Sequence, residues 1–277
     1  MASPQIALAE QLSSASPAHD RRSRRPDILL FIGLAIAIGA AIVGLRSTGV
    51  SLTYFLQPTG ALMVLGGTIG VLLITTPSRS LLNSLRRVAT LVTASETDRA
   101  ALIDEIVECS RQSRRGGFLA LESMLPKMGN SPLRSAFELA VDIGNPAELR
   151  TVLETGLQMA ERQGEADAKT LEVAAGFAPT LGIMGTVVGL IEVLRQFSNF
   201  SSVGYGIGTA FVSTIYGLAL ANLLLLPLAH RIRARVADNF ETQELIMEGV
   251  LAIADSVHPA LIRMRLASFL RKPTREK

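Results

Sequence analysis

The sequence contains no tryptophan, three tyrosines and a single cysteine, and only 18% of its 277 residues are charged. One cysteine excludes an internal disulfide and a metal site built from cysteines alone. A soluble domain of this length normally carries more charge, so the low fraction, together with 48% hydrophobic residues, favours a membrane protein. Because aromatic residues are scarce, an aromatic belt cannot be used to place the membrane interfaces.

Catalytic and metal-binding patterns are also missing. The three histidines, His19, His230 and His258, are scattered and lack zinc-ligand spacing, and no phosphate-binding loop of the GxxxxGK[ST] kind occurs. Asp255 and Ser256 lie too close to His258 along one probable helix end to converge with it as a catalytic triad. We therefore expect neither an enzyme nor a resident cofactor.

Four apolar segments are long enough to cross roughly 30 Å of hydrocarbon at about 1.5 Å per residue. They cover residues 27–45, 57–76, about 171–195 and about 207–229. Short links join the first two and the last two, and the polar segment 77–170 separates the pairs. No segment shows a clear strand pattern. The sequence predicts an all-α integral membrane protein with four transmembrane helices and a helical cytoplasmic domain.

The predicted organisation follows from these segments. Residues 1–26 are rich in Ser, Ala, Pro and Arg, which is typical of disorder. The central segment has leucines and valines at helical spacing. We expect a disordered cytoplasmic N-terminus, a first transmembrane helix pair, a cytoplasmic helical domain, a second transmembrane helix pair, and a cytoplasmic C-terminal helix and tail, covering 1–26, 27–76, 77–170, 171–229 and 230–277.

Two breaks interrupt the central segment. Asn130-Ser131-Pro132 and Gly144-Asn145-Pro146 each combine a polar residue with proline, which is typical of a helix start. We expect Ser131 and Asn145 to be the capping residues.

Arginine placement predicts the orientation. Arginines are concentrated before the first span, after the second and after the fourth, whereas the two short links contain only Arg46. The positive-inside rule then places both termini and the central segment in the cytoplasm. The first apolar run starts late and lacks a small-residue cleavage site, so we expect no cleaved signal peptide.

The spans are rich in small residues at positions three or four apart, which allow close approach of helix backbones in lipid. The stripes predicted to pack are Gly33, Ala37 and Ala41 on the first span; Gly66 and Gly70 on the second; Gly182, Gly185, Thr186 and Gly189 on the third; and Ala210, Thr214, Gly217 and Ala221 on the fourth. Pro179 is expected to kink the third span or to free one backbone carbonyl.

The interior of the spans lacks Asp, Glu, Lys, Arg and His outside the terminal turns. Ion-moving proteins usually carry a carboxylate within the membrane. This chain offers hydroxyls instead, Thr186 and Thr214, at similar depth. Either the protein is a membrane anchor without ion chemistry, or a second protein supplies the charged group. The hydroxyl of Thr186 has a purely structural alternative, a bond back to its own helix.

The third span, GFAPTLGIMGTVVGLIEVL, resembles that of the MotA/PomA stator proteins of the flagellar motor. STIYGLALANLLLLPLA and LMVLGGTIGVLLI are similar to their fourth and second spans. The resemblance covers about residues 27–260. The related TolQ and ExbB proteins have three spans, so the four expected here favour the MotA side.

The resemblance implies a stator subunit of an ion-driven rotary motor in the bacterial inner membrane. Five such chains, a homopentamer, surround two copies of a MotB-type partner whose single span carries an essential aspartate. Ions, H⁺ or Na⁺ with H⁺ preferred, pass at that interface and produce torque on a FliG-type rotor protein for flagellar rotation. The alternatives are a TolQ/ExbB-like energiser of outer-membrane or other envelope processes and a passive membrane scaffold.

The resemblance also assigns residues. Pro179 and Pro227 correspond to two functional prolines, and Thr186 and Thr214 to hydroxyl positions along the ion pathway. In SRRGGFLALE, Arg114 and Glu122 match a pair that contacts the rotor, and Arg115 is an alternative to Arg114. A solvated helix end is the plain structural alternative for this charged pair.

Overall fold

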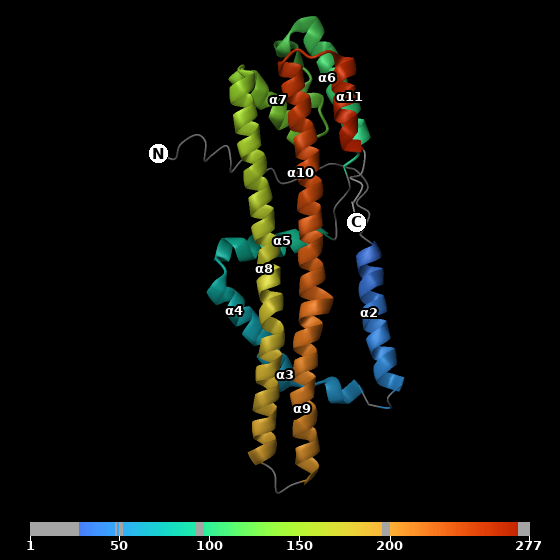
Figure 1. Ribbon diagram of the computed structural model, residues 1–277, viewed down its shortest axis with the longest axis vertical. Helices are drawn as coiled ribbons and strands as arrows, with labels where there is room; N and C mark the ends of the chain where they lie inside the picture. The colour runs from blue at the N-terminus through green and yellow to red at the C-terminus, as the bar shows by residue number, and fades with distance from the viewer. Residues whose placement is uncertain (1–27, 48, 50–51, 92–96, 196–199, 271–277) are drawn as a thin grey trace. The chain divides into compact units, whose positions relative to one another are not determined.

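The computed structural model describes residues 28–47, 49, 52–91, 97–195 and 200–270, so the predicted disordered N-terminus lies outside the described residues. Every regular element within these ranges is helical, and the all-α prediction is confirmed. The elements, drawn in Figure 1, are α2 (Ile28–Ser47), η1 (Leu52–Phe55), α3 (Pro58–Ala61), η2 (Leu62–Gly66), α4 (Gly67–Thr75), α5 (Ser78–Leu91), α6 (Arg99–Gly116), η3 (Phe118–Leu121), η4 (Leu125–Lys127), α7 (Ser131–Ile143), α8 (Pro146–Arg195), α9 (Phe200–Ala219), η5 (Leu220–Leu225), α10 (Leu226–Ala254), α11 (Pro259–Leu266) and η6 (Ala267–Leu270).

The chain folds into two compact units. The first, here called the span unit, comprises Arg25–Ala94 and Gly164–Ala234. The second, here called the core unit, comprises Ser95–Gln163 and Arg235–Lys277. The long helices α8 and α10 contribute residues to both units.

The core unit is held together by large apolar side chains. Phe137 and Leu133 of α7, Ile106 of α6, Leu149 of α8 and Leu245 of α10 are almost completely buried. Burying one such side chain stabilises a fold by about 1.5–3 kcal/mol. Residues from α11, including Ile262 and Leu266, belong to the same cluster. This unit therefore has the interior of an ordinary water-soluble helical domain.

Side-chain caps fix where the helices of the core unit begin. Asp98 accepts from the backbone N–H groups of Ala100 and Ala101 at the start of α6. The amide oxygen of Asn145 accepts from Ala147 N at the start of α8, as predicted. The prediction that Ser131 caps α7 is wrong, because the cap is Asn130, whose extended backbone lets its side chain reach Leu133 N at 3.0 Å.

Among the residues that the structure describes, three helices are long and apolar enough to cross a membrane, over Pro58–Thr75, Pro146–Arg195 and Gly206–Ala254. In the first predicted span, the apolar stretch Ala35–Ser47 is shorter than that criterion requires, so the count of four spans stays a prediction. The segment boundaries at 77, 171 and 230 also stay predictions. The helix α8 has 50 residues and continues through 170/171 without a break.

Candidate functional site

In the span unit α8 and α9 run antiparallel and side by side, with backbones in direct contact (Figure 1). A Cβ added at Gly182 would lie 2.9 Å from the backbone oxygen of Ser213, and one at Gly189 would lie 3.0 Å from the Cα of Ala210. A Cβ at Gly217 would lie 2.5 Å from the backbone oxygen of Ala178. No larger residue fits at these positions without moving a helix, and lipid-embedded helices associate through such contacts.

The second span joins this pair through different glycines from those the sequence singled out. A Cβ at Gly60 would lie 2.5 Å from the hydroxyl of Ser213, and one at Gly67 would lie 3.0 Å from the side chain of Leu181. A Cβ at Gly66 would meet only Leu62 of its own span, and one at Gly70 would meet nothing within 4 Å. The packing role of Gly66 and Gly70 stays a prediction.

Ser213 lies between glycines of two helices. A Cβ at Gly185 of α8 would meet its side chain at 2.7 Å, so Ser213 fills the space that Gly60 and Gly185 both leave open. Its side chain is buried. Sequence reasoning missed this residue, because a serine one position before Thr214 carries no distinguishing signal. Gly60 and Gly67 are seven residues apart, so the sequence does place them on the same face of the second span.

The hydroxyl groups of Thr186 and Thr214 form a pair between α8 and α9, with their oxygen atoms 2.6 Å apart. The Thr186 hydroxyl also lies 3.1 Å from the carbonyl oxygen of Gly182 in its own helix and 3.2 Å from that of Ala210 in α9. The back-bond to α8 and the contact across helices therefore occur together. A hydroxyl has one proton to donate and can also accept, so Thr186 can donate to one of these carbonyl oxygens while it accepts from Thr214.

Pro179 lies at a close backbone contact between α8 and α9. Its Cα would be 3.1 Å from a Cβ at Gly217. Proline has no N–H, so the carbonyl of Ala175 lacks the donor that a regular helix would give it. Ala175 and Ala178 form a buried cluster with Ala221 of η5. The helix irregularity therefore faces the neighbouring span rather than only lipid.

Two segments of the spans are π-helices, η2 on the second span and η5 between α9 and α10. Pro227 lies two residues after the end of η5, at the second position of α10, and is exposed. π-helical turns are rare and are frequent at functional sites. Irregular backbone therefore occurs in α8, at Pro179, and in the segment that directly continues α9, at η5 and Pro227.

A polar contact closes one end of the three-helix packing. Tyr216 of α9 donates its hydroxyl to the backbone oxygen of Phe55 and accepts from the backbone N–H of Gln57 at 3.2 Å. Gln57, at the start of the second span, is buried. These two hydrogen bonds therefore join the link before the second span to α9, at a residue two positions after Thr214.

Charged groups lie at the other end of the spans. Arg87 of α5 contacts the buried carboxylate of Asp167 at 2.5 Å. Arg233 of α10 contacts Glu172 of α8 at 2.6 Å and Glu165 at 3.8 Å. These pairs join α5 and α10 to α8 just outside the uncharged zone.

The predicted rotor-contact residues lie in the core unit. Arg114 and Arg115 are exposed in the last turn of α6, and Glu122 is exposed in the turn after η3. Their charges are open to solvent, and nothing in the described residues shows what they face.

Taken together, the span unit defines a class: a helical membrane protein whose apolar helices meet through small residues around a hydroxyl pair, with charge only at the ends. Comparison with known proteins narrows this class. Residues 123–244 match the model of the MotA/TolQ/ExbB proton channel family. Motility protein A of Bacillus subtilis (strain 168) is 30% identical over 252 residues, which cover 89% of this chain and 92% of that protein.

Two further proteins agree with this result. Chemotaxis protein PomA of Vibrio alginolyticus is 27% identical over 249 residues, covering 90% of this chain and 97% of that protein. The solved structure of the flagellar MotAB stator complex from Bacillus subtilis superposes with a TM-score of 0.79 at 27% identity, covering 87% of this chain and 95% of that one. The chain belongs to the MotA family of motility proteins.

Proposed function

We propose that this chain is the stator subunit of an ion-driven rotary motor and conducts ions together with a MotB-type partner. The observation that carries the proposal is the hydroxyl pair of Thr186 and Thr214, 2.6 Å apart, in a span interior without charged residues. A cation cannot cross such a zone unaided, because burial of an uncompensated charge is costly. The proposal assigns the missing negative charge to the partner's single span.

The threonine pair gives that partner carboxylate a place to act. A hydroxyl accepts a hydrogen bond from a protonated carboxyl group and donates one to an ionised carboxylate. Pro179 and Pro227 add backbone irregularity on α8 and α10, which lets the two helices bend as the carboxylate changes charge. In this proposal the four residues line the ion pathway.

The transported ion is proposed to be H⁺. The family model is described as a proton channel family, which supports H⁺. Hydroxyl oxygens also suit a dehydrated Na⁺, so sodium is the second candidate.

The remaining parts of the proposal concern assembly. We place the chain in the bacterial inner membrane with both termini in the cytoplasm, as a homopentamer around the partner. The arginine distribution supports this orientation. Exposed Arg114 and Glu122 then lie on the cytoplasmic core unit, where charges of opposite sign would set the register with the rotor protein.

The proposal is tested by producing the chain in a motor-deficient cell with and without its MotB-type partner. Motility is expected only with both, and only while the partner's membrane aspartate is intact. Efficient proton or sodium flux through vesicles that contain this chain alone would refute the proposal. A scaffold would need no aspartate, and a TolQ/ExbB-like energiser would restore outer-membrane functions but not swimming.

Single substitutions test the pathway. Pro179→Ala is expected to abolish torque while membrane insertion stays normal, and loss of insertion would indicate a folding role instead. Thr186→Val is expected to reduce torque strongly. Thr180→Val is the matched control, because the exposed Thr180 hydroxyl bonds only to Phe177 of its own helix among the contacts described. Equal defects in the two threonine variants would contradict the assignment of Thr186.

A further inference from the structure

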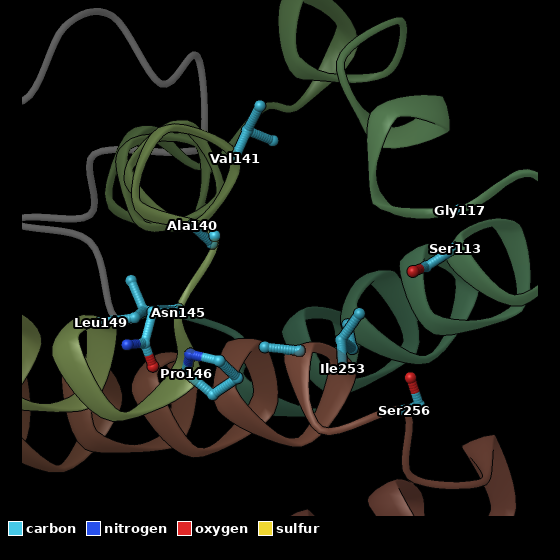
Figure 2. A pocket seen from close by; sticks show the side chains of 11 residues that line it. Ser113, Gly117, Ala140, Val141, Asn145, Pro146, Leu149, Ile253 and Ser256 are labelled. Atoms are coloured by element: carbon cyan, nitrogen blue, oxygen red, sulfur yellow. The ribbon is translucent and has the colours of Figure 1, made fainter.

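A cavity in the core unit and one face of α5 both lie outside the proposed ion pathway. The cavity has a volume of about 310 Å³ and is shown from close by in Figure 2. Its wall includes the hydroxyl groups of Ser113 and Ser256, and none of its lining side chains is charged. The face of α5 instead combines exposed leucines with exposed arginines. An uncharged cavity selects no class of ligand, whereas leucines beside arginines do.

The inner face of α5 is fixed on α8. The hydroxyl group of the buried Ser84 lies 2.9 Å from the backbone oxygen of Asp167, and Arg87 contacts the Asp167 carboxylate at 2.5 Å. At about 100° per residue, Leu82 lies about 200° from Ser84 around the helix. Leu85 is turned from Arg87 by the same angle. Both leucines therefore point away from α8, and they are 49% and 56% exposed.

Two arginines line one edge of this leucine face. Arg79 and Arg86 are seven residues apart, so they share one side of α5 at a separation of about 10 Å along its axis. They lie within about 60° of Leu82 around the helix. Both are exposed, and neither has an ion-pair partner among the residues that the structure describes. Because α5 contains no acidic residue, its outer face is apolar with uncompensated positive charge along one edge.

The neighbours of α5 place it where the spans leave the hydrocarbon. It begins at Ser78, three residues after the second span ends at Thr75, so at most about 11 Å of chain separates the two. Its partner Asp167 lies four residues before the expected start of the third span, which is about 6 Å along α8. Figure 1 shows α5 lying across α8 rather than along it. This is the arrangement of a helix in the plane of a membrane surface.

We infer that α5 is a binding surface for anionic phospholipids, with Leu82 and Leu85 among the acyl chains and Arg79 and Arg86 on headgroup phosphates. Interfacial helices bind through buried apolar area together with attraction of basic residues to anionic lipids. An apolar protein surface would leave both arginines without partners. A guanidinium group donates two parallel hydrogen bonds to a phosphate, which suits this occupant. The site goes beyond ion conduction and does not depend on it.

The absence of tryptophan from this chain allows a direct test. Leu82→Trp places one reporter on the outer face of α5, in the full chain assembled with a MotB-type partner whose tryptophans are replaced by phenylalanine. The complex is reconstituted in phosphatidylcholine vesicles with a rising share of brominated phosphatidylglycerol or, in parallel, brominated phosphatidylcholine. Bromine quenches tryptophan fluorescence on contact, so quenching measures which lipid lies against α5. Phosphatidylglycerol is expected to bind about threefold or more tightly than phosphatidylcholine.

Substitution of the arginines tests whether they select the lipid. In the reporter complex, Arg79→Gln with Arg86→Gln is expected to make the two lipids bind about equally, while quenching by brominated phosphatidylcholine persists. Arg111→Gln with Arg150→Gln is the matched control, because it removes the same charge from exposed positions of the core unit. The control should keep the preference for phosphatidylglycerol. An equal loss in both variants would mean that total charge selects the lipid, and would overturn the inference.

Other occupants of this face give different results. If neither brominated lipid quenches the reporter, a second copy of the chain or another protein covers α5, and the inference is wrong. Equal binding of the two lipids with both arginines intact would overturn the anionic headgroup. Excess glycerol phosphate, which lacks acyl chains, is expected not to displace phosphatidylglycerol, and displacement would reassign the site to soluble phosphate esters. None of these measurements involves ion flow or a rotor, so failure of the proposed function would not alter them.

Discussion

The two units of this chain use opposite rules to hold helices together. In the core unit large side chains such as Phe137 and Leu133 exclude water from a common interior. In the span unit the contacts are made where side chains are smallest, at Gly182, Gly189 and Gly217. Lipid is as apolar as leucine, so burying a large side chain between helices gains little there, and close backbone contact replaces it.

The helix α8 shows both rules within one element. Its buried apolar residues in the core unit include Leu149 and Leu157. In the span unit most of them are alanines, and its backbone contacts with α9 are made at Gly182 and Gly189; the buried apolar residues there are Ala168, Leu171, Ala174, Ala175, Ala178 and Val193. Gly164 lies at the boundary between the two units, and the helix continues through it. The surroundings of a helix, rather than its secondary structure, therefore determine which residues it places at its contacts.

The largest expected effect tests the core unit. Phe137→Ala removes a fully buried ring and should destabilise this unit by about 3–5 kcal/mol. Limited proteolysis of the membrane-inserted protein measures it, with new cuts expected in residues 97–163 and not in the spans. Met159→Ala is the control, because the Met159 side chain is 53% exposed and its loss should change stability by no more than about 0.5 kcal/mol. Cuts within the spans would show that the units do not unfold separately.

The second prediction tests the span unit with a single methyl group. Gly217→Ala places a Cβ 2.5 Å from the Ala178 oxygen and should cost about 1–3 kcal/mol as the helices separate. Gly70→Ala adds the same group where no atom lies within 4 Å, and should be neutral or slightly stabilising because alanine favours helix. Thermal unfolding in detergent and swimming speed measure both.

The control variant has its own value. If Gly70→Ala proves as harmful as Gly217→Ala while the single chain remains stable, Gly70 contacts another chain in the assembly. That outcome would support the predicted packing role of Gly70. The contrast between the core unit and the span unit would then hold only for contacts within one subunit.

How far the sequence predicts this structure differs between the units for the same physical reason. Helical periodicity identified the amphipathic helices, and small-residue spacing identified Gly182, Gly189 and Gly217, which lie at backbone contacts. Periodicity could not choose between Gly60 and Gly70 on the second span. Both occur on an apolar helix, and lipid does not separate an inner from an outer face as water does.

The candidate site was predicted unevenly. Thr186 and Thr214 were paired from their similar depth, and the structure places their hydroxyls together. Ser213 and Tyr216 were missed because their partners are far away in the sequence and meet them only in the folded chain. The cap of α7 was placed one residue late, since Asn130 and Ser131 are both good caps and only the backbone conformation decides between them.

A smaller effect sharpens the comparison at the hydroxyl pair. Thr186→Val and Thr214→Val should each cost about 1 kcal/mol, and the double variant should cost less than the sum because both remove one shared hydrogen bond. Thermal unfolding of the wild type, the two single variants and the double variant gives the coupling free energy between the two hydroxyl groups. An additive result would mean that Thr186 is held by Gly182 and Ala210 alone, and that packing in the span unit depends on shape without polar specificity.

The smallest effect at neutral pH concerns Cys109, which is fully buried in the core unit. Burial, helped by Glu105 and Glu108, raises the pKa of this thiol from 9.0 to about 12. Unfolded chains lose the thiol proton near pH 9 while the folded unit keeps it, so this contribution to stability is complete below pH 9 and is lost as the pH rises towards 12. Cys109→Ala should therefore flatten the decline in unfolding free energy between pH 9 and 11 and leave its slope near pH 7 unchanged. Because an interior that excludes water is what raises the pKa, equal slopes for the two proteins above pH 9 would mean that water reaches the thiol. The core unit would then lack the dry interior that distinguishes it from the span unit.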